Sequence, residues 1–180
     1  MSFEQGLQWM NWLLCWSLGL QCVEYLRTQH MTSAKGVWAW SVQQADIPMS
    51  HPGMRSLLEK LYSPAWHSTH LWLRFYVVAF MGVNGVNLGS VMFLFASTLL
   101  ILVRWRGAFN GGSDFMSLVV LTGLLIEEVL RVLVDPEIAA KAGLWYVTIH
   151  AISSYFVSGW VKLLRPEWRS GRAMTIFLNG

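Results

Sequence analysis

Long apolar stretches separated by short polar segments dominate the hydropathy pattern of this 180-residue chain. Five of these stretches approach the roughly 20 residues that a helix needs to cross the hydrocarbon core of a bilayer. No alternating pattern typical of strands appears. The sequence therefore predicts an all-α, polytopic membrane helix bundle with four or five spanning helices, forming one integral membrane domain over residues 1–180. The predicted spans are roughly 7–25, 69–86, 89–105, 115–134 and 144–163.

The polar segments predict how these helices are connected. GVNGVNLG (82–89) contains glycines and asparagines that suit a tight turn, so the second and third stretches form an antiparallel pair. Arg74 interrupts the second stretch, and the third is short. In the longer connection 26–68, MRSLLEKLY (54–62) predicts a short amphipathic helix.

Composition agrees with a membrane protein. The chain is 54% hydrophobic and 13% charged, whereas about a quarter of the residues of an ordinary soluble domain are charged. Its 11 tryptophans suit rings that lie at the level of lipid headgroups. High hydrophobicity with a net charge of only +3 excludes intrinsic disorder.

The distribution of cations predicts orientation, because short cytoplasmic loops are rich in Lys and Arg. With five crossings, Lys141 is the single cation outside the spans on one side. We therefore expect an integral protein of a bacterial inner membrane with a cytoplasmic C-terminus, with the lipid bilayer and further protein chains as partners and no nucleic acid. The cations on the cytoplasmic side are Arg27, Lys35, Arg55, Lys60, Arg104, Arg106, Arg165, Arg169 and Arg172.

The segment LLIEEVLRVLV places charged residues in a predicted span. Arg131 follows Glu127 by four residues and Glu128 by three, so either carboxylate can pair with it on one helix face. A structural ion pair is one interpretation, because buried ions are normally paired. The other is a site in which the surplus carboxylate carries protons or binds the polar part of a cofactor. The spacing leaves both open.

Histidines are the next candidates. His150 lies in the last span, where it can act as a catalytic base or form a hydrogen bond between helices. His67 and His70 form an HxxH pair on one helix face. Binuclear metal proteins combine histidines with ExxH pairs, and this chain has none. We expect no metal and an interfacial position for the pair.

The segment VRWRGAFNGGSD suggests a site for negative charge. Arg104 and Arg106 precede glycines, and Asp114 follows near the start of the next helix. Ser113 or Asp114 suits a helix N-cap, which explains the segment structurally. Alternatively, the arginines and the helix start converge on an anion or a polar headgroup.

Lys162 lies at the end of the last span, three residues after Gly159. It can extend its ammonium group to the headgroup region as an anchor. In an apolar pocket, a lysine loses its proton more easily and can act as a catalytic base. The periodicity does not distinguish these roles.

Two segments resemble a known membrane family. RWRGAFNGGSDFMSLVV (104–120) and SYFVSGWVKLLRPEWRSGRAM (154–174) resemble the horizontally transferred transmembrane family, and LYSPAWHSTHLWLRFYVV (61–78) supports the likeness. This family shares its membrane domain with vitamin K-dependent gamma-carboxylase and is related to DoxX-like membrane proteins. The resemblance implies a helical bundle and, in the carboxylase branch, oxidation of a reduced quinone that drives carboxylation of glutamate.

The resemblance also assigns a residue. In the carboxylase branch a basic lysine occupies a YF-x-x-G-x-x-K setting, which Lys162 matches. Trp168 lies one residue later than the family spacing, and the family continues into a substrate-binding domain, so a carboxylase-like enzyme here needs a partner chain.

Three functions follow as expectations. The first is an accessory subunit that binds a quinone or isoprenoid-like lipid and supports a redox or modification reaction, with Lys162, His150 and the group Glu127, Glu128 and Arg131 as polar contacts. The second is a structural subunit packed into a larger complex. The third is a reduced carboxylase-like enzyme completed by a partner. A transporter is disfavoured because no inverted repeat is visible.

Overall fold

The computed structural model describes residues 2–33, 35–36, 38–44, 52–105 and 111–179. Within these ranges the chain is helical and contains no strand, so the all-α part of the prediction is confirmed. In chain order the helices are α1 (Phe3–Arg27), α2 (Gln29–Thr32), α3 (Trp40–Gln43), α4 (Pro52–Leu61), α5 (Pro64–Asn84), α6 (Leu88–Trp105), α7 (Gly111–Leu130), α8 (Pro136–Leu164), α9 (Pro166–Arg169) and α10 (Arg172–Asn179).

Helix α1 begins at a capping box. The Ser2 hydroxyl accepts a hydrogen bond from the backbone N–H of Gln5, at 3.2 Å, and the Gln5 side-chain oxygen accepts one from the backbone N–H of Ser2, at 3.0 Å. These bonds satisfy N–H groups that the first turn leaves without helical partners. The buried residues of α1 recur mostly every three or four positions, which makes one stripe face the bundle: Leu7, Asn11, Leu14, Cys15, Leu18, Gln21, Cys22 and Tyr25.

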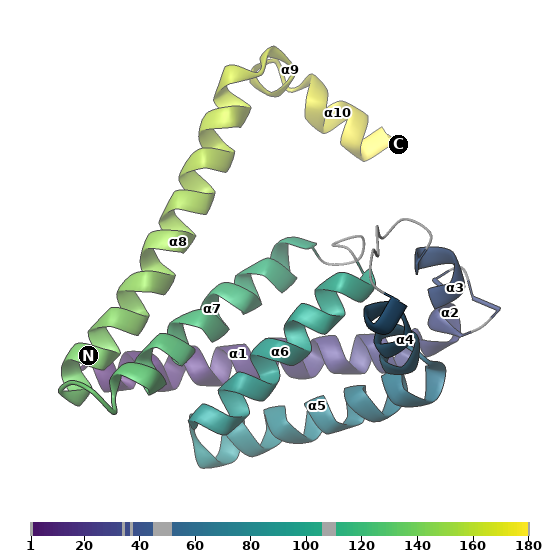
Figure 1. Cartoon of the computed structure of the whole chain (residues 1–180). Coiled ribbons are helices and arrows are strands. Elements are labelled where there is room, and N and C mark those ends of the chain that lie inside the picture. Colours follow the sequence, from purple (N-terminus) through teal and green to yellow (C-terminus); the bar gives the residue numbers. More distant parts are fainter. Residues whose placement is uncertain (1, 34, 37, 45–51, 106–110, 180) are drawn as a thin grey trace.

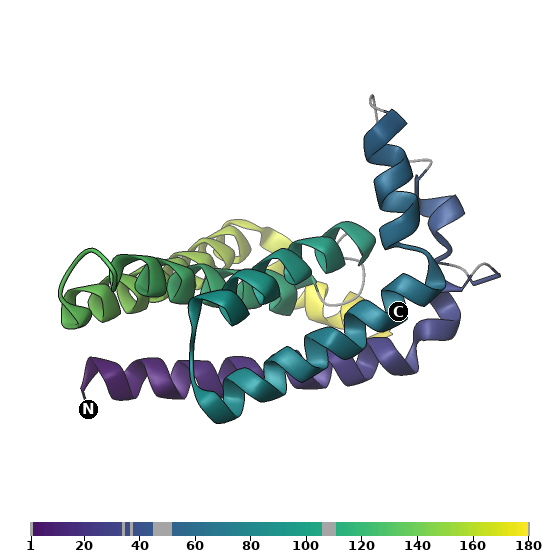
Figure 2. The same ribbon diagram turned by 60° about the horizontal axis from the view of Figure 1, so that its bottom comes forward.

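Helices α5 and α6 form the predicted antiparallel pair. Pro64 lies in the first turn of α5, where its fixed φ suits a helix. The helix ends at Asn84 because Gly85 adopts a φ of 86°, in the left-handed region that favours glycine. Helix α6 begins at Leu88, three residues after Gly85. Figures 1 and 2 show the two helices side by side.

The core lies where α1, α5, α6 and α7 meet. Helix α6 packs between α5 and α7, while α1 contacts α5, α7 and α8 (Figure 2). Apolar side chains from all four helices lose their exposure there, and Leu18, Leu94, Leu121 and Leu124 are each 0% exposed. Burying a leucine contributes about 1.5–3 kcal/mol, so this cluster supplies much of the driving force for packing.

Helix α8 joins the bundle only by its first turns. Its buried residues, among those described, are Ala139, Ala140 and Gly143. Farther along, α8 rises away from α7, and α9 and α10 lie at its far end (Figure 1). This second half leaves large apolar side chains exposed, including Ile152, Tyr155, Phe156, Trp160 and Leu164.

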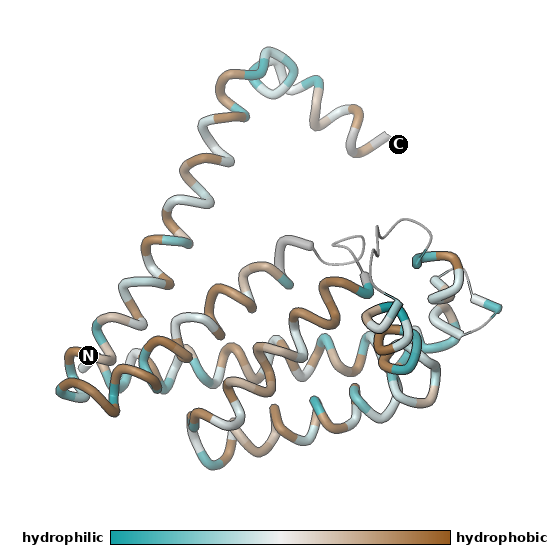
Figure 3. The backbone as a smooth tube through the Cα atoms, viewed as in Figure 1, coloured by the Kyte–Doolittle hydropathy of each residue, from teal (hydrophilic) through white to brown (hydrophobic). Residues whose placement is uncertain are grey.

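The predicted membrane spans are wrong. Within the described part of the chain, no helix has both the length and the apolar character that crossing a membrane requires. The five predicted segments are helical, yet polar residues interrupt them: α5 contains His67, His70 and Arg74, and the hydropathy colouring in Figure 3 changes repeatedly along α5 and α8. Helix α6 has 18 residues, including Arg104, against the roughly 20 that a span needs.

The same finding overturns the predicted location. The prediction of an integral position in an inner membrane, with a cytoplasmic C-terminus, depends on the five crossings. Since the described helices cannot cross a membrane, this prediction is wrong as well. Composition was a poor guide because tryptophan and tyrosine count as hydrophobic although each carries a polar N–H or O–H group.

Candidate functional site

The predicted ion pair forms between Glu127, in the last turn of α7, and Arg131, directly after the helix. Arg131 Nε donates to Glu127 Oε1 at 2.8 Å, and Arg131 Nη2 donates to the same oxygen. Glu127 is 1% exposed whereas the Arg131 side chain is 49% exposed, so a buried carboxylate reaches its partner at the surface. Burial and the charge of Glu127 raise the pKa of Glu128, while Arg131 and the backbone of Leu88 act in the opposite direction. The predicted ion pair is therefore present, and a separate role for the surplus carboxylate of Glu128 stays a prediction.

Lys162 and His150 lie on the exposed second half of α8. The Lys162 ammonium group lies 4.7 Å from the centroid of the Trp168 ring, in a cation–π contact. The His150 ring lies 4.4 Å from the Tyr146 ring on the same helix. Neither residue lines the grooves and cavities described below. Among the described residues, both candidate catalytic residues therefore lie on an exposed helix surface and not in one of these three cavities.

The sequence predicts that Arg104 and Asp114 lie together at a site for anions. In the structure, each of them has different partners. Asp114 turns into the core, where Gln21 Nε2 donates to its Oδ1 and the Tyr25 hydroxyl donates to its Oδ2 at 3.1 Å. Arg104 Nη2 instead donates to the backbone carbonyl of Thr32 at 3.1 Å. Arg106 lies outside the described residues.

A buried polar network centred on Arg74 connects four helices. Arg74 is 0% exposed, and its Nη1 donates to the hydroxyls of Ser97 and Thr98 on α6 at 2.8 and 3.0 Å. Its Nη2 donates to Gln21 Oε1 on α1 at 2.9 Å. Because Gln21 also donates to Asp114 on α7, one amide bridges a buried cation and a buried anion.

Electrostatic shifts in this network have clear causes. Burial lowers the pKa of Arg74, and the neighbouring Cys22, Tyr25 and Asp114 oppose this shift. Burial also raises the pKa of Asp114, against the hydrogen bonds from Tyr25 and Gln21 and the charge of Arg74. Desolvation disfavours both charged forms, and the bridging amide offsets part of that cost. The sequence shows Arg74 merely as an interruption, although a charge within an apolar helix indicates a buried partner.

A second cluster surrounds Arg104, in the last turn of α6. Its guanidinium carbon lies 5.8 Å from the Trp40 ring centroid and 5.3 Å from that of Tyr62. The two rings are themselves 4.4 Å apart. Tyr62 is held in place by its hydroxyl, which donates to the carbonyl of Leu100 at 2.9 Å. We call Arg104, Trp40, Tyr62 and His67 the Arg104 cluster.

The HxxH histidines are not at an interface, contrary to the prediction. His67 is 3% exposed, and His70 is half-buried with its Nε2 2.8 Å from the Ser97 hydroxyl. Burial, followed by the charge of Arg104 and by His70, lowers the pKa of His67 to about 4. No set of three His, Cys, Asp or Glu side chains within the described ranges is arranged to hold a metal ion.

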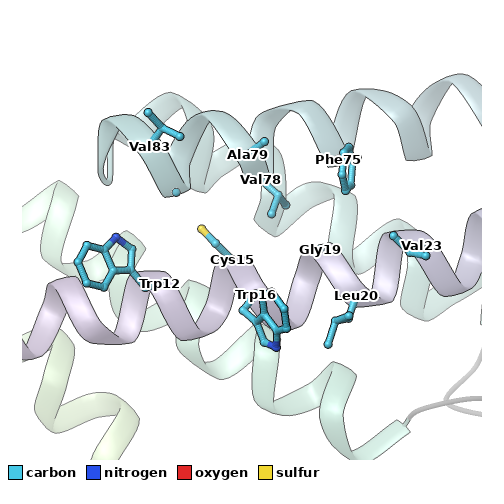
Figure 4. Close-up of a pocket in the computed structure, with 11 residues that line it drawn as sticks. Trp12, Cys15, Trp16, Gly19, Leu20, Val23, Phe75, Val78, Ala79 and Val83 are labelled. Carbon is cyan, nitrogen blue, oxygen red and sulfur yellow. The ribbon is translucent and has the colours of Figure 1, made fainter.

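An apolar groove runs between α1 and α5, with a volume of about 530 Å³ (Figure 4). We call it the α1–α5 groove. Its α1 wall consists of Trp12, Cys15, Trp16, Gly19, Leu20 and Val23, and its α5 wall of Phe75, Val78, Ala79, Gly82 and Val83. None of these side chains carries a charge at neutral pH, since burial raises the pKa of Cys15 to about 11.

Comparison with known proteins assigns no role to these sites. No family model, curated protein or solved structure matches the chain. The resemblance to the horizontally transferred transmembrane family stays a prediction, and the site residues are argued from geometry and chemistry alone.

Proposed function

We propose that the protein is an accessory subunit that binds a linear, isoprenoid-like ligand in the α1–α5 groove. The observation that carries this proposal is the lining of the groove, which combines apolar faces of two helices, including Trp12, Trp16 and Phe75, with no ionised group. Small-molecule sites are typically concave, mostly apolar and about 300–1,000 Å³ in volume, and this groove lies within that range at about 530 Å³.

The shape of the groove favours a chain over a compact ring system. Trp12 and Val23 mark its two ends on α1 (Figure 4), and they are about 16 Å apart by helical rise. Between them the helices come close, because a Cβ atom on Gly82 would be 3.6 Å from the Cβ atom of Cys15. A long, narrow and uncharged groove suits a hydrocarbon chain, whose burial is favourable without any polar partner.

Binding of radiolabelled farnesol, an isoprenoid alcohol, to the purified full chain tests this proposal by equilibrium dialysis. We expect saturable binding at one site. In Gly19→Leu, affinity should fall about tenfold or more, because the new side chain occupies volume that the ligand buries. There is room for a side chain to enter the groove here, since the nearest atom to a Cβ on Gly19 is Val78 Cγ1 at 4.0 Å.

Gly159→Leu is the matched control. It makes the same substitution on a helix, at a glycine whose Cβ would meet nothing within 4 Å. Farnesol should bind this variant as tightly as it binds the unmodified chain. Absence of saturable binding, or equal affinity in Gly19→Leu, would refute the proposal.

A second candidate function is a structural subunit that packs through α8. It is favoured by the large apolar residues of the second half of this helix, such as Tyr155 at 77% exposed and Phe156 at 67%. Contiguous apolar surface of this kind usually marks an interface. The exposed positions of Lys162 and His150 fit this function without assigning them catalysis.

A further inference from the structure

Arg104 is a buried cation whose hydrogen-bonding capacity is only partly used. It is 0% exposed, and its Nε and Nη1 find no acceptor in the part of the chain that the structure describes. Burial lowers the pKa of Arg104 to about 10, and the charge that opposes this shift is that of the Tyr62 phenol. A guanidinium stays charged at neutral pH, so burying it without an anion is costly.

His67 adds a further unsatisfied group beside this cation. Its Nε2 is buried and has no hydrogen-bond partner among the described residues. With its pKa lowered to about 4, the ring is neutral at pH 7 and adds no charge. The Arg104 cluster therefore holds one net positive charge, together with an imidazole nitrogen that can donate a hydrogen bond.

Two cavities adjoin the cluster. The larger, of about 300 Å³, is lined by Thr32, Trp40 and Tyr62 among others, and Arg104 contacts all three. The smaller, of about 40 Å³, is lined by His67 and also by Tyr62, so one ring separates the two spaces. Among the described residues that line the larger cavity, Glu59 is the one carboxylate, and it pairs with Arg55 at 3.2 Å.

We infer that the Arg104 cluster binds a small organic carboxylate. In the larger cavity the carboxylate group would take the unused donors of Arg104, which lies against the lining residues, and the body of the ligand would pack against Trp40 and Tyr62. The charge of the site decides the chemical class of the ligand. One buried cation balances a monoanion, whereas a phosphate dianion would leave excess negative charge buried. No residue lines both this site and the α1–α5 groove, so the inference goes beyond the proposed function.

Isothermal titration of the full chain with sodium benzoate tests the inference. Benzoate should bind at one site and raise the Tm, as any ligand specific for the folded state does. Benzamide, which has the same ring but no charge, should bind about tenfold or more weakly, because a charge-assisted hydrogen bond is lost. Inorganic phosphate and chloride serve as the other anions, and tighter binding of either would overturn the choice of a carboxylate.

Substitution of the arginine separates a binding role from a structural one. Arg104→Met keeps an unbranched side chain and removes the charge, so benzoate binding should fall at least about tenfold while the Tm without benzoate stays equal or rises. Arg165→Met, at an exposed arginine, should change neither value. A fall in the Tm of Arg104→Met without benzoate, or unchanged benzoate affinity, would show that Arg104 is structural and refute the inference. A Trp40→Leu variant supplies a second measurement, in which benzoate affinity should also fall.

Discussion

His67 carries a pH dependence that follows from its burial. The pKa of His67 is 6.5 ordinarily and about 4 in the folded chain. At pH values between these two, His67 binds a proton in the unfolded state but not in the folded state. A base whose pKa is lowered on folding contributes stability above pH 6.5, and this contribution is lost as the pH falls toward 4. The groups that face His67 are Arg104 and His70. The pKa of His70 is also lowered to about 4.

We therefore predict that the free energy of unfolding falls on acidification from pH 7 to pH 4. The loss due to His67 is about 3 kcal/mol, at about 1.4 kcal/mol for each unit of pKa shift. Urea titrations at a series of pH values measure it, and His67→Phe should make the profile shallower. His150→Phe, at an exposed histidine, is the control and should leave the slope unchanged. A slope in His67→Phe as steep as that of the unmodified chain would assign the effect to other groups, such as His70.

At the scale of single helices, the apolar pattern was sufficient to locate the elements. All five predicted segments lie largely within α1, α5, α6, α7 and α8, and the break near Gly85 is confirmed. Hydrophobic periodicity and turn residues are local signals, so they can be read without the fold. Whether such a helix spans a membrane depends on its polar residues, and the prediction of spans gave these too little weight. Arg74, for example, is a charged residue of α5 that is buried within the bundle by hydrogen bonds to α1 and α6.

The crossing of α7 and α8 depends on two glycines that the pattern did not identify. A Cβ on Gly143 would lie 2.6 Å from the carbonyl oxygen of Gly123, and one on Gly123 would lie 2.5 Å from Val147 Cγ2. The first of these contacts is with backbone, which cannot rotate aside as a side chain can. The helices must therefore move apart to accept any larger residue at Gly143.

We predict that Gly143→Ala destabilises the chain by about 1–3 kcal/mol, because the cost of overpacking exceeds the gain in helix propensity of about 1 kcal/mol. Gly159→Ala makes the same change later in α8, where nothing lies within 4 Å, and should stabilise the chain by about 0.5–1 kcal/mol. Urea denaturation of the two variants gives the comparison. Equal effects of the two substitutions would contradict the close crossing.

On the scale of the whole molecule, the candidate sites were the least predictable feature. The pair Glu127 and Arg131 could be predicted because the two residues are four positions apart, at the end of α7 and directly after it. The Arg104 cluster could not, since it brings together Trp40, Tyr62 and His67 from separate segments. The α1–α5 groove likewise depends on the register of two helices. Sites built across elements require the packing to be known, whereas sites within one helix do not.

The second half of α8 leads to a prediction about assembly. Its apolar side chains lie on several sides of the helix, with Ile152 at 65%, Phe156 at 67% and Leu164 at 64% exposed. Several large apolar side chains exposed together on one segment usually mark an interface. Because twofold-symmetric dimers of identical copies are the commonest oligomers, the simplest partner for this segment is α8 of a second copy, packed across a twofold axis.

We accordingly expect a dimer in sedimentation equilibrium at micromolar concentration. The double variant Phe156→Glu with Trp160→Glu replaces two rings that stack 6.3 Å apart by two carboxylates. It should weaken association about tenfold or more, since each charge would have to be buried without a partner. Thr175→Glu adds a negative charge on α10 and should leave the dimer intact. A chain that sediments as a monomer, or a dimer that tolerates both carboxylates on α8, would show that the exposed half of this helix does not join two copies.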